Sequence, residues 1–189
     1  MPRHLRFLPP DSVAHVVNRG NDRRRLFERA REFDDFLRLV SWAKAKCPVR
    51  IAAYCVMSNH WHFVFWPELD GDVSAFLHRL TTTHAISWRK RTGILGHGHV
   101  YQDRFKASMV FTERYYFNVI RYVEQNPLRA GIVNASREWR WSSLAERLGT
   151  RHGILDEGPT DLPMDWPGLV DETISEDVLE EIRNSLRRH

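Results

Sequence analysis

Residues 54–66 read Tyr54-Cys55-Val56-Met57-Ser58-Asn59-His60-Trp61-His62-Phe63-Val64-Phe65-Trp66, an apolar stretch that carries two histidines separated by one residue. Ser58-Asn59 predicts a turn or bulge between two strands, with the histidines at the start of the second strand. Side chains alternate between the faces of a strand, so His60 and His62 project in the same direction. Two imidazoles on one face can bind one divalent cation.

Hydrophobic periodicity on both sides of this stretch predicts the remaining elements. The predicted elements are a strand at Val13–Asn18, a helix at Arg29–Lys46, a helix from Asp72 to Gly93, a strand over Val100–Phe111, and a helix that opens at Thr112 and ends at Asn126 before Pro127. The order strand, helix, strand, strand, helix, strand, helix predicts an α+β protein. We expect a ferredoxin-like (RRM-like) antiparallel sheet with helices on one face, followed by a C-terminal extension.

The charge of the chain is divided unevenly. Residues 1–153 hold 25 Lys and Arg against 14 Asp and Glu, whereas residues 154–189 hold 3 against 10. Clustered arginines suit phosphate recognition because their donors are planar and forked, although basic runs also occur on ordinary solvated surfaces. We therefore expect a domain of residues 1–153 and an acidic extension of residues 154–189, with a loop and then a short terminal helix. The extension either mimics nucleic acid by folding over the basic face or is inert.

The composition is typical of a globular protein without a membrane-spanning segment. Residues 1–11 contain no apolar run that resembles a signal peptide. The two cysteines, Cys47 and Cys55, form no CxxC pair that would indicate a disulfide framework or a thiolate zinc site. These features predict a cytoplasmic protein with no membrane partner.

A second candidate motif is Tyr122-Val123-Glu124-Gln125-Asn126-Pro127. The predicted helix sets Tyr122 and Asn126 four residues apart, on one face. A phenol with an ordinary pKa of about 10 is a poor nucleophile at neutral pH and needs a nearby cation or base. Together with the histidine pair, this motif predicts a metal-assisted tyrosine nucleophile, for which Tyr115 and Tyr116 are competing candidates.

Five motifs in this order resemble those of the REP-associated tyrosine transposases, relatives of the single-tyrosine HUH transposases. They lie within residues 13–149 and read Ala14-His15-Val16-Val17-Asn18-Arg19-Gly20-Asn21, Met57-Ser58-Asn59-His60-Trp61-His62, Gly98-His99-Val100-Tyr101-Gln102-Asp103-Arg104-Phe105, Tyr122-Val123-Glu124-Gln125-Asn126-Pro127-Leu128-Arg129-Ala130-Gly131 and Trp139-Arg140-Trp141-Ser142-Ser143. An isolated HxH pair arises by chance, whereas this ordered set is far more specific. The resemblance implies a ferredoxin-like domain that cleaves and rejoins single-stranded DNA at hairpin-forming repeats.

The resemblance also implies roles for individual residues. Tyr122 would attack a phosphodiester to give a 5′-phosphotyrosine linkage and a free 3′-hydroxyl, and reverse attack would rejoin the DNA without a nucleotide cofactor. His60 and His62 would hold Mg²⁺ or Mn²⁺ against the scissile phosphate. Asn126 would complete the protein ligands, at a position where the insertion-sequence relatives carry the longer glutamine. The implied partner is single-stranded hairpin DNA, and the oligomeric state stays open.

Several side chains are candidates for direct contact with DNA. The candidates for the phosphate backbone are Arg19, Arg23, Arg24, Arg104 and Arg129, and those for base stacking are Trp61, Tyr101 and Phe105, which are otherwise core residues. Three further histidines, His84, His97 and His99, are expected on the surface or in loops, although His97 and His99 repeat the HxH spacing. Two other functions stay open: a non-catalytic nucleic-acid-binding protein, and a metal-dependent nuclease that uses water and survives Tyr122→Phe.

Overall fold

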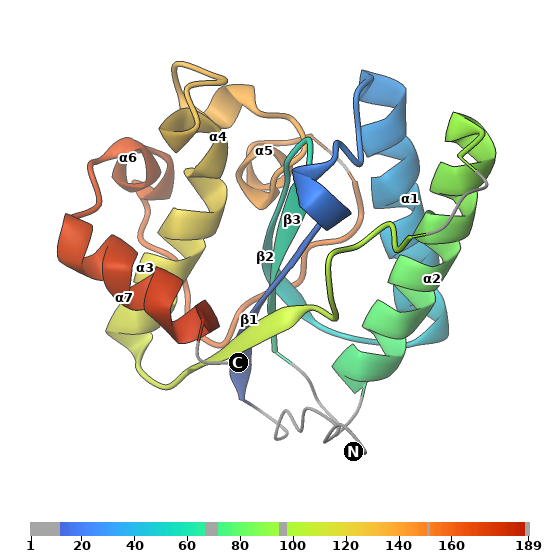
Figure 1. The fold of residues 1–189 in the computed structure, drawn as a ribbon. Helices are drawn as coiled ribbons and strands as arrows, with labels where there is room; N and C mark the ends of the chain where they lie inside the picture. Colours follow the sequence, from blue (N-terminus) through green and yellow to red (C-terminus); the bar gives the residue numbers. More distant parts are fainter. Residues whose placement is uncertain (1–11, 67–71, 95–97, 151, 188–189) are drawn as a thin grey trace.

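A computed structural model of the chain describes residues 12–66, 72–94, 98–150 and 152–187. Within these residues the centre is an antiparallel sheet of four strands, β1 (Val13–Arg19), β2 (Ile51–Val56), β3 (His60–Phe65) and β4 (Lys106–Val110) (Figure 1). The strands lie in the order β2-β3-β1-β4, so β1 is central and pairs with both β3 and β4. This order confirms the predicted α+β, ferredoxin-like class.

Helices α1 (Ala30–Lys46) and α2 (Asp72–Thr92) cover one face of the sheet, as predicted (Figure 1). Helix α1 buries side chains that recur at helical spacing, namely Phe33, Phe36, Leu37, Val40 and Ala43. They pack against alternate residues of the strands, including Val16, Trp61 and Phe63. No helix of the described residues has the length and apolar character needed to cross a membrane.

Two expectations about side chains on this face are wrong. Trp61 is fully buried and cannot stack on a DNA base. His84 is buried as well, because it follows Leu77 and Leu80 on the inner stripe of α2. The Tyr101 hydroxyl joins the two, 2.7 Å from His84 Nδ1 and 3.3 Å from Trp61 Nε1. His99 is exposed as expected, and His97 lies outside the described residues.

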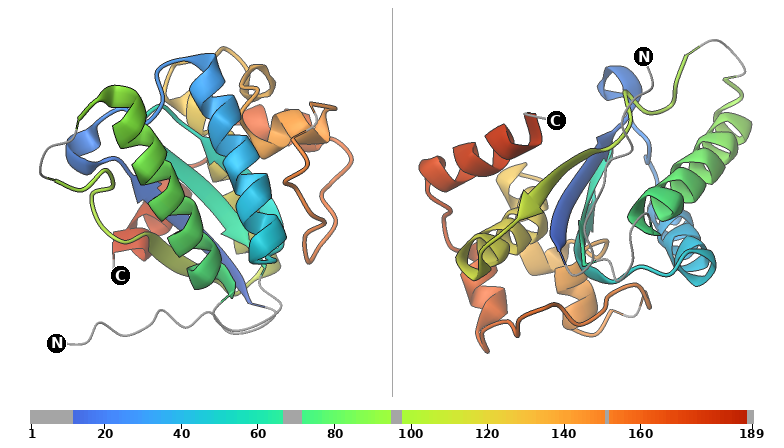
Figure 2. Two further views of the ribbon diagram at one scale, coloured as in Figure 1. Left: turned by 90° about the vertical axis from the view of Figure 1, so that its right-hand side faces the viewer. Right: turned by 90° about the horizontal axis from the view of Figure 1, so that it is seen from below.

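The opposite face of the sheet also carries a layer of helices, whereas the sequence pattern led us to expect helices on one face only (Figure 2). This layer consists of α3 (Glu113–Glu124), α5 (Ser143–Arg147), α6 (Trp166–Asp171) and α7 (Glu176–Arg187). Three short elements join them or the strands: η1 (Asn21–Arg23), α4 (Asn126–Arg129) and η2 (Ser136–Glu138). The layer forms because the strands present apolar residues on this face too, among them Val13, Cys55 and Val64.

The C-terminal segment belongs to this second core. Its fully or nearly fully buried side chains include Trp166, Val170, Leu179, Ile182 and Leu186, and α7 packs against β4 and α3. Burying a large apolar side chain stabilises a fold by roughly 1.5–3 kcal/mol. The expectation of an inert extension is therefore wrong. The acidic residues of α7 remain on its exposed side, among them Glu176, Asp177, Glu180 and Glu181.

Two elements differ in length from the predictions. Helix α3 begins after Thr112, whose side chain accepts a hydrogen bond from Tyr115 N, and its last residue is Glu124, close to the expected limits. The last strand is shorter than the expected Val100–Phe111. Tyr101 makes an isolated bridge with Gly20. The chain from Tyr101 to β4 then leaves the sheet, because residues 102–104 are polar and exposed.

Candidate catalytic site

The two histidines of β3 share the face of the sheet that carries α3. Their ring centroids lie 5.0 Å apart, with His62 buried and His60 partly exposed. His60 Nδ1 donates a 2.7 Å hydrogen bond to Asn59 Oδ1, and His62 Nδ1 lies 2.9 Å from His15 Nε2. Because Asn59 and His15 engage the two Nδ1 atoms, Nε2 is the ring nitrogen of each histidine that remains for another ligand or for the Asn126 side chain.

Burial keeps all three of these imidazoles neutral. It lowers the pKa of His60 from 6.5 to about 4, with a further contribution from the charge of Arg19, while a hydrogen bond with the Asn126 side chain opposes the shift. Burial also lowers the pKa of His62 well below 6.5 and that of His15 to about 3. A neutral imidazole has the lone pair that binding a cation requires.

The loop after β1 holds the turn from which His60 projects. Gly20 N donates a 2.8 Å hydrogen bond to Asn59 O, and the amides of Leu26 and Phe27 donate to Ser58 O at 2.8 and 3.0 Å. A Cβ at Gly20 would lie 2.4 Å from Arg24 O, so only glycine fits this close approach. The loop that begins at Gly20 therefore holds the Ser58-Asn59 turn, from which His60 projects, through three backbone hydrogen bonds.

Tyr122 lies across from the histidines on α3. Its ring is edge-on to those of His62 and His15, with centroid distances of 5.8 and 5.9 Å. Asn126, at the start of α4, is buried, and its Nδ2 has no hydrogen-bond partner among the described residues. The other two tyrosines of α3 are elsewhere: Tyr116 is buried near Gly158, and the Tyr115 hydroxyl donates to Ser185 Oγ at 3.1 Å.

A buried carboxylate fixes the helix that carries Tyr122. Glu124 is fully buried and accepts hydrogen bonds from Ser143 Oγ at 2.5 Å, Arg147 Nε at 3.2 Å and Trp166 Nε1 at 2.7 Å. These partners come from α5 and α6, so the network ties α3 to the C-terminal segment. Sequence reasoning missed this role of Glu124, because its partners have no fixed spacing from it.

The histidines, Tyr122 and Asn126 line one cavity of about 450 Å³. Three of the five arginines predicted to contact DNA line it as well, namely Arg19, Arg104 and Arg129. The Arg129 guanidinium lies 4.2 Å from the ring centroid of Tyr122, which places a permanent positive charge beside the phenol.

The other two predicted arginines lie away from this cavity. Arg23 is exposed at the end of η1. Arg24 packs its guanidinium over Trp88, 5.4 Å from the ring centroid, and its Nε donates to Asn21 O at 3.1 Å.

Helix α7 forms part of the same cavity wall through Arg183, Leu186 and Arg187. These residues were not expected at the site, because the net charge of residues 154–189 is negative. The apolar side of α7 packs on the protein, so its arginines at the rim reach the cavity while its carboxylates face solvent. Residues 154–189 do reach the cavity, but among the described residues they do so with basic and apolar side chains, so the expected acidic mimicry of nucleic acid is not what lines it.

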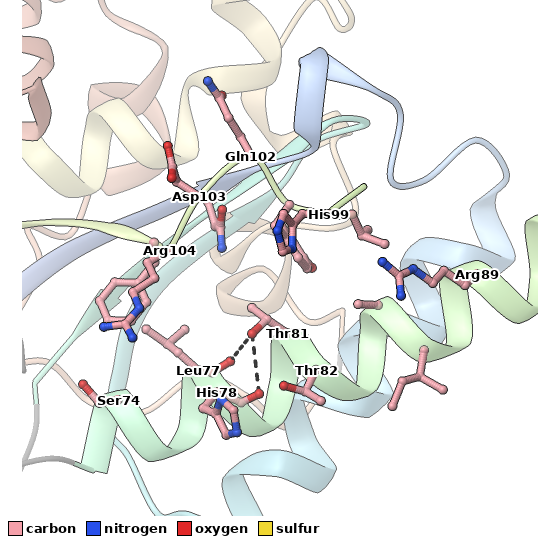
Figure 3. A pocket seen from close by; sticks show the side chains of 16 residues that line it. Ser74, Leu77, His78, Thr81, Thr82, Arg89, His99, Gln102, Asp103 and Arg104 are labelled. Carbon is pink, nitrogen blue, oxygen red and sulfur yellow. Dashed lines mark hydrogen bonds between the residues drawn. The ribbon is translucent and has the colours of Figure 1, made fainter. Parts of the chain in front are cut away.

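A second, larger cavity adjoins the first. It has a volume of about 680 Å³ and lies between α2 and residues 99–105 (Figure 3). The two cavities share Asn18, Gln102, Asp103 and Arg104 as lining residues, so they form a continuous groove. Its wall on α2 carries hydroxyls and cations, including those of Thr81, Thr82 and Arg89 (Figure 3). Tyr101, which is buried, and the partly exposed Phe105 also line it.

Comparisons with known proteins bear on this arrangement. The family model described as "Transposase IS200 like" matches residues 10–126, which include His60, His62, Tyr122 and Asn126. Among curated proteins, none matches the chain in sequence. A solved structure of the REP-associated tyrosine transposase bound to a REP hairpin is similar with a TM-score of 0.62 and 22% identity, over 86% of this chain and 95% of that one, a likeness that shows a shared fold. The matched residues cover more than half of the sequence, and the chain belongs to the family of IS200-like transposases.

Proposed function

We propose that this protein cleaves and rejoins single-stranded DNA at hairpin-forming repeats, with Tyr122 as the nucleophile. The observation that carries the proposal is the convergence of Tyr122, His60, His62 and Asn126 on one cavity lined by arginines. The similar transposase whose structure holds a REP hairpin supports hairpin DNA as the partner. We place the reaction on cytoplasmic DNA and assign it to a catalytic domain of residues 1–153, to which residues 154–189 are added.

The proposed reaction is a transesterification. Tyr122 Oη attacks the phosphorus of a phosphodiester, the bond from phosphorus to the 3′-oxygen breaks, and the 3′-oxygen leaves as a hydroxyl with the proton that the phenol gives up. The 5′-phosphate remains linked to the tyrosine, so a second 3′-hydroxyl can reverse the step without a nucleotide cofactor. Arg129, beside the phenol, is positioned to bind the phosphate through charge-assisted hydrogen bonds.

The residues present fit a divalent cation of the Mg²⁺ or Mn²⁺ type. The described residues contain no group of three or more His, Cys, Asp and Glu side chains arranged for a metal, but the proposed set consists of two histidines and an amide. Asn59 and His15 engage the Nδ1 atoms of His60 and His62, so Nε2 of each histidine would bind the cation, and the side-chain oxygen of the buried Asn126 would be the third protein ligand. A bound cation would polarise the non-bridging oxygens of the phosphate. The histidines and Asn126 would hold it.

The groove offers a path for the strand on either side of the scissile phosphate. Arg19, Arg104 and Arg129 would bind the backbone near Tyr122. The larger cavity, with Phe105 in its wall, would take unpaired nucleotides on an apolar floor. Arg23, which is exposed, and Arg24 remain candidates for backbone contacts outside the cavity.

The test is a denaturing-gel assay with labelled single-stranded hairpin DNA in Mg²⁺ or Mn²⁺. We expect a labelled band at the combined mass of protein and DNA, which Tyr122→Phe and His60→Ala remove and the matched variant Tyr115→Phe retains. Cleavage by Tyr122→Phe without a covalent band would indicate hydrolysis by water. Binding without cleavage in either ion would indicate a non-catalytic DNA-binding protein. Either result would overturn the proposal.

A further inference from the structure

His15 is a fully buried histidine at the centre of the sheet, and the proposed reaction does not use it directly. It lies on β1 opposite Val64 of β3 and Ser108 of β4, between Val13 and Val17 on the same face. In this register Val17 pairs with His62, so His15 and His62 are diagonal neighbours on the face toward α3. An aliphatic side chain would suit such a position better than an imidazole.

His15 contacts both the histidine pair and the tyrosine of the candidate site. Its ring lies nearly parallel to that of His62, with centroids 5.2 Å apart and an interplanar angle of 24°, and its Nε2 lies 2.9 Å from His62 Nδ1. On another side it meets the Tyr122 ring edge-on. Its Nδ1 is buried without a hydrogen-bond partner among the described residues, and such an unpaired group is unfavourable. Among the described residues, the contact with His62 is therefore the polar interaction that accounts for an imidazole at position 15.

The neighbouring histidine shows what such a contact does. Asn59 Oδ1 can only accept, so the hydrogen bond places the proton of His60 on Nδ1 and keeps the lone pair on Nε2. Among the residues that the structure describes, His62 Nδ1 has no carbonyl or carboxylate partner and lies against His15 Nε2 instead. A neutral imidazole has one donor nitrogen and one acceptor nitrogen, so the pair has two arrangements. His62 Nε2 keeps its lone pair only when His15 Nε2 accepts.

We propose that His15 is a positioning residue for His62: by accepting a hydrogen bond from His62 Nδ1, it holds that ring with the Nε2 lone pair free to bind a divalent cation. The inference rests on the metal-assisted function proposed above and deepens it. His15 itself does not line the cavity, so it acts through His62 and touches neither the cation nor DNA. Partners of this kind orient metal-binding histidines and typically change the metal affinity about 10- to 100-fold when they are removed.

The test measures Mn²⁺ binding by the full chain without DNA, by electron paramagnetic resonance of the free ion. The site of interest is the one that His62→Ala abolishes, which separates it from adventitious binding by surface carboxylates. We expect His15→Leu to raise its dissociation constant about 10- to 100-fold. His15→Gln, whose amide oxygen reaches as far as Nε2, should restore most of the affinity.

His84→Leu is the matched control. His84 is also buried, with Nδ1 bonded to the Tyr101 hydroxyl and Nε2 unpaired, but it lies on the other face of the sheet. The His84→Leu variant should therefore leave the Mn²⁺ dissociation constant unchanged. Thermal unfolding reports whether each variant is folded. If His15→Leu does not fold, the comparison of His15→Gln with His15→Asn carries the test, because asparagine is too short to reach His62.

The outcomes separate this inference from the proposed function. Equal Mn²⁺ affinity in wild type and His15→Leu, or in the glutamine and asparagine variants, would overturn the role of His15 and leave the transesterification in place. A wild-type chain with no site sensitive to His62→Ala would overturn the metal role and the inference together. The covalent product of His15→Leu should return at raised Mn²⁺ concentration, whereas Tyr122→Phe should form none at any concentration.

Discussion

The two faces of the sheet differ in what they bury. The face under α1 and α2 is filled almost entirely by aromatic and aliphatic side chains, with Trp61, Phe63 and Phe65 from one strand alone. The face under α3 buries polar groups among its apolar residues, including His15, His62, Glu124 and Asn126. Burying polar groups is costly unless each is hydrogen-bonded. The comparison indicates that the first face supplies stability, and that the second uses part of that stability to hold reactive groups in place.

The largest expected effect compares two neighbours on β3. Trp61→Ala should lower the free energy of unfolding by about 3–5 kcal/mol, because it leaves a large cavity in the apolar face. His62→Ala should lower it by less while abolishing the covalent DNA product. Urea denaturation of both variants, together with the denaturing gel, measures the difference. Equal losses of stability in the two variants would contradict the idea that the apolar face contributes more to stability than the polar face.

The carboxylate network of the polar face should give the next largest effect. Glu124→Gln removes the charge that Arg147 and Trp166 meet in the interior, and hydrogen bonds to charged groups contribute about 1.5–3 kcal/mol. We expect the free energy of unfolding, measured by urea denaturation, to fall by that amount. Glu180→Gln, on the exposed side of α7, should change stability by less than about 0.5 kcal/mol. A neutral effect of Glu124→Gln would mean that packing alone holds α3.

The buried histidines on both faces of the sheet should make the stability of the protein depend on pH in the same way. Burial lowers the pKa of His60 to about 4 and those of His15 and His84 to about 3, so the unfolded chain takes up protons below pH 6.5 that the folded chain does not. Stability is therefore full above pH 6.5 and falls as the pH falls toward the lowered pKa values. Each such histidine contributes a slope of up to about 1.4 kcal/mol per pH unit.

Urea denaturation between pH 4 and 7 measures this slope. His15→Leu and His84→Leu should each reduce it by a similar amount, one on each face. The double variant should reduce it by the sum, because the two residues lie on opposite faces of the sheet. An unchanged slope in either single variant would show that the corresponding imidazole is protonated in the folded chain.

The smallest expected effect concerns the arginines of the cavity. Arg104→Gln should weaken binding of single-stranded hairpin DNA and reduce the slope of log affinity against log salt by about 0.7, the value for one phosphate contact on a single strand. Fluorescence anisotropy over a range of salt concentrations measures both quantities. Arg38→Gln, exposed on α1 behind the apolar face, should leave them unchanged. Equal slopes for the two variants would place the DNA away from the cavity.

Local periodicity was enough to predict most of the fold. Alternation of side chains along β3 put His60 and His62 on one face, and helical spacing put Tyr122 of α3 near Asn126, which begins α4. The order of the elements predicted the ferredoxin-like sheet. Periodicity predicted the helix that forms α3 but not α5 and α6 beside it, because these short helices are stabilised by the residues they pack on and have little local signal of their own.

The sequence by itself therefore determined the class of fold, the family, and the residues that carry its motifs, since these depend on spacing along the chain. Tertiary structure alone decided which distant residues meet. The register of β1 against β3 brings His15 to His62, and the packing of α7 brings Arg183 and Arg187 to the cavity. It also buried Trp61 and His84, which the pattern had left open to DNA or solvent. Contacts between strands and helices far apart in sequence follow from pairing and packing, for which no spacing in a single chain provides a signal.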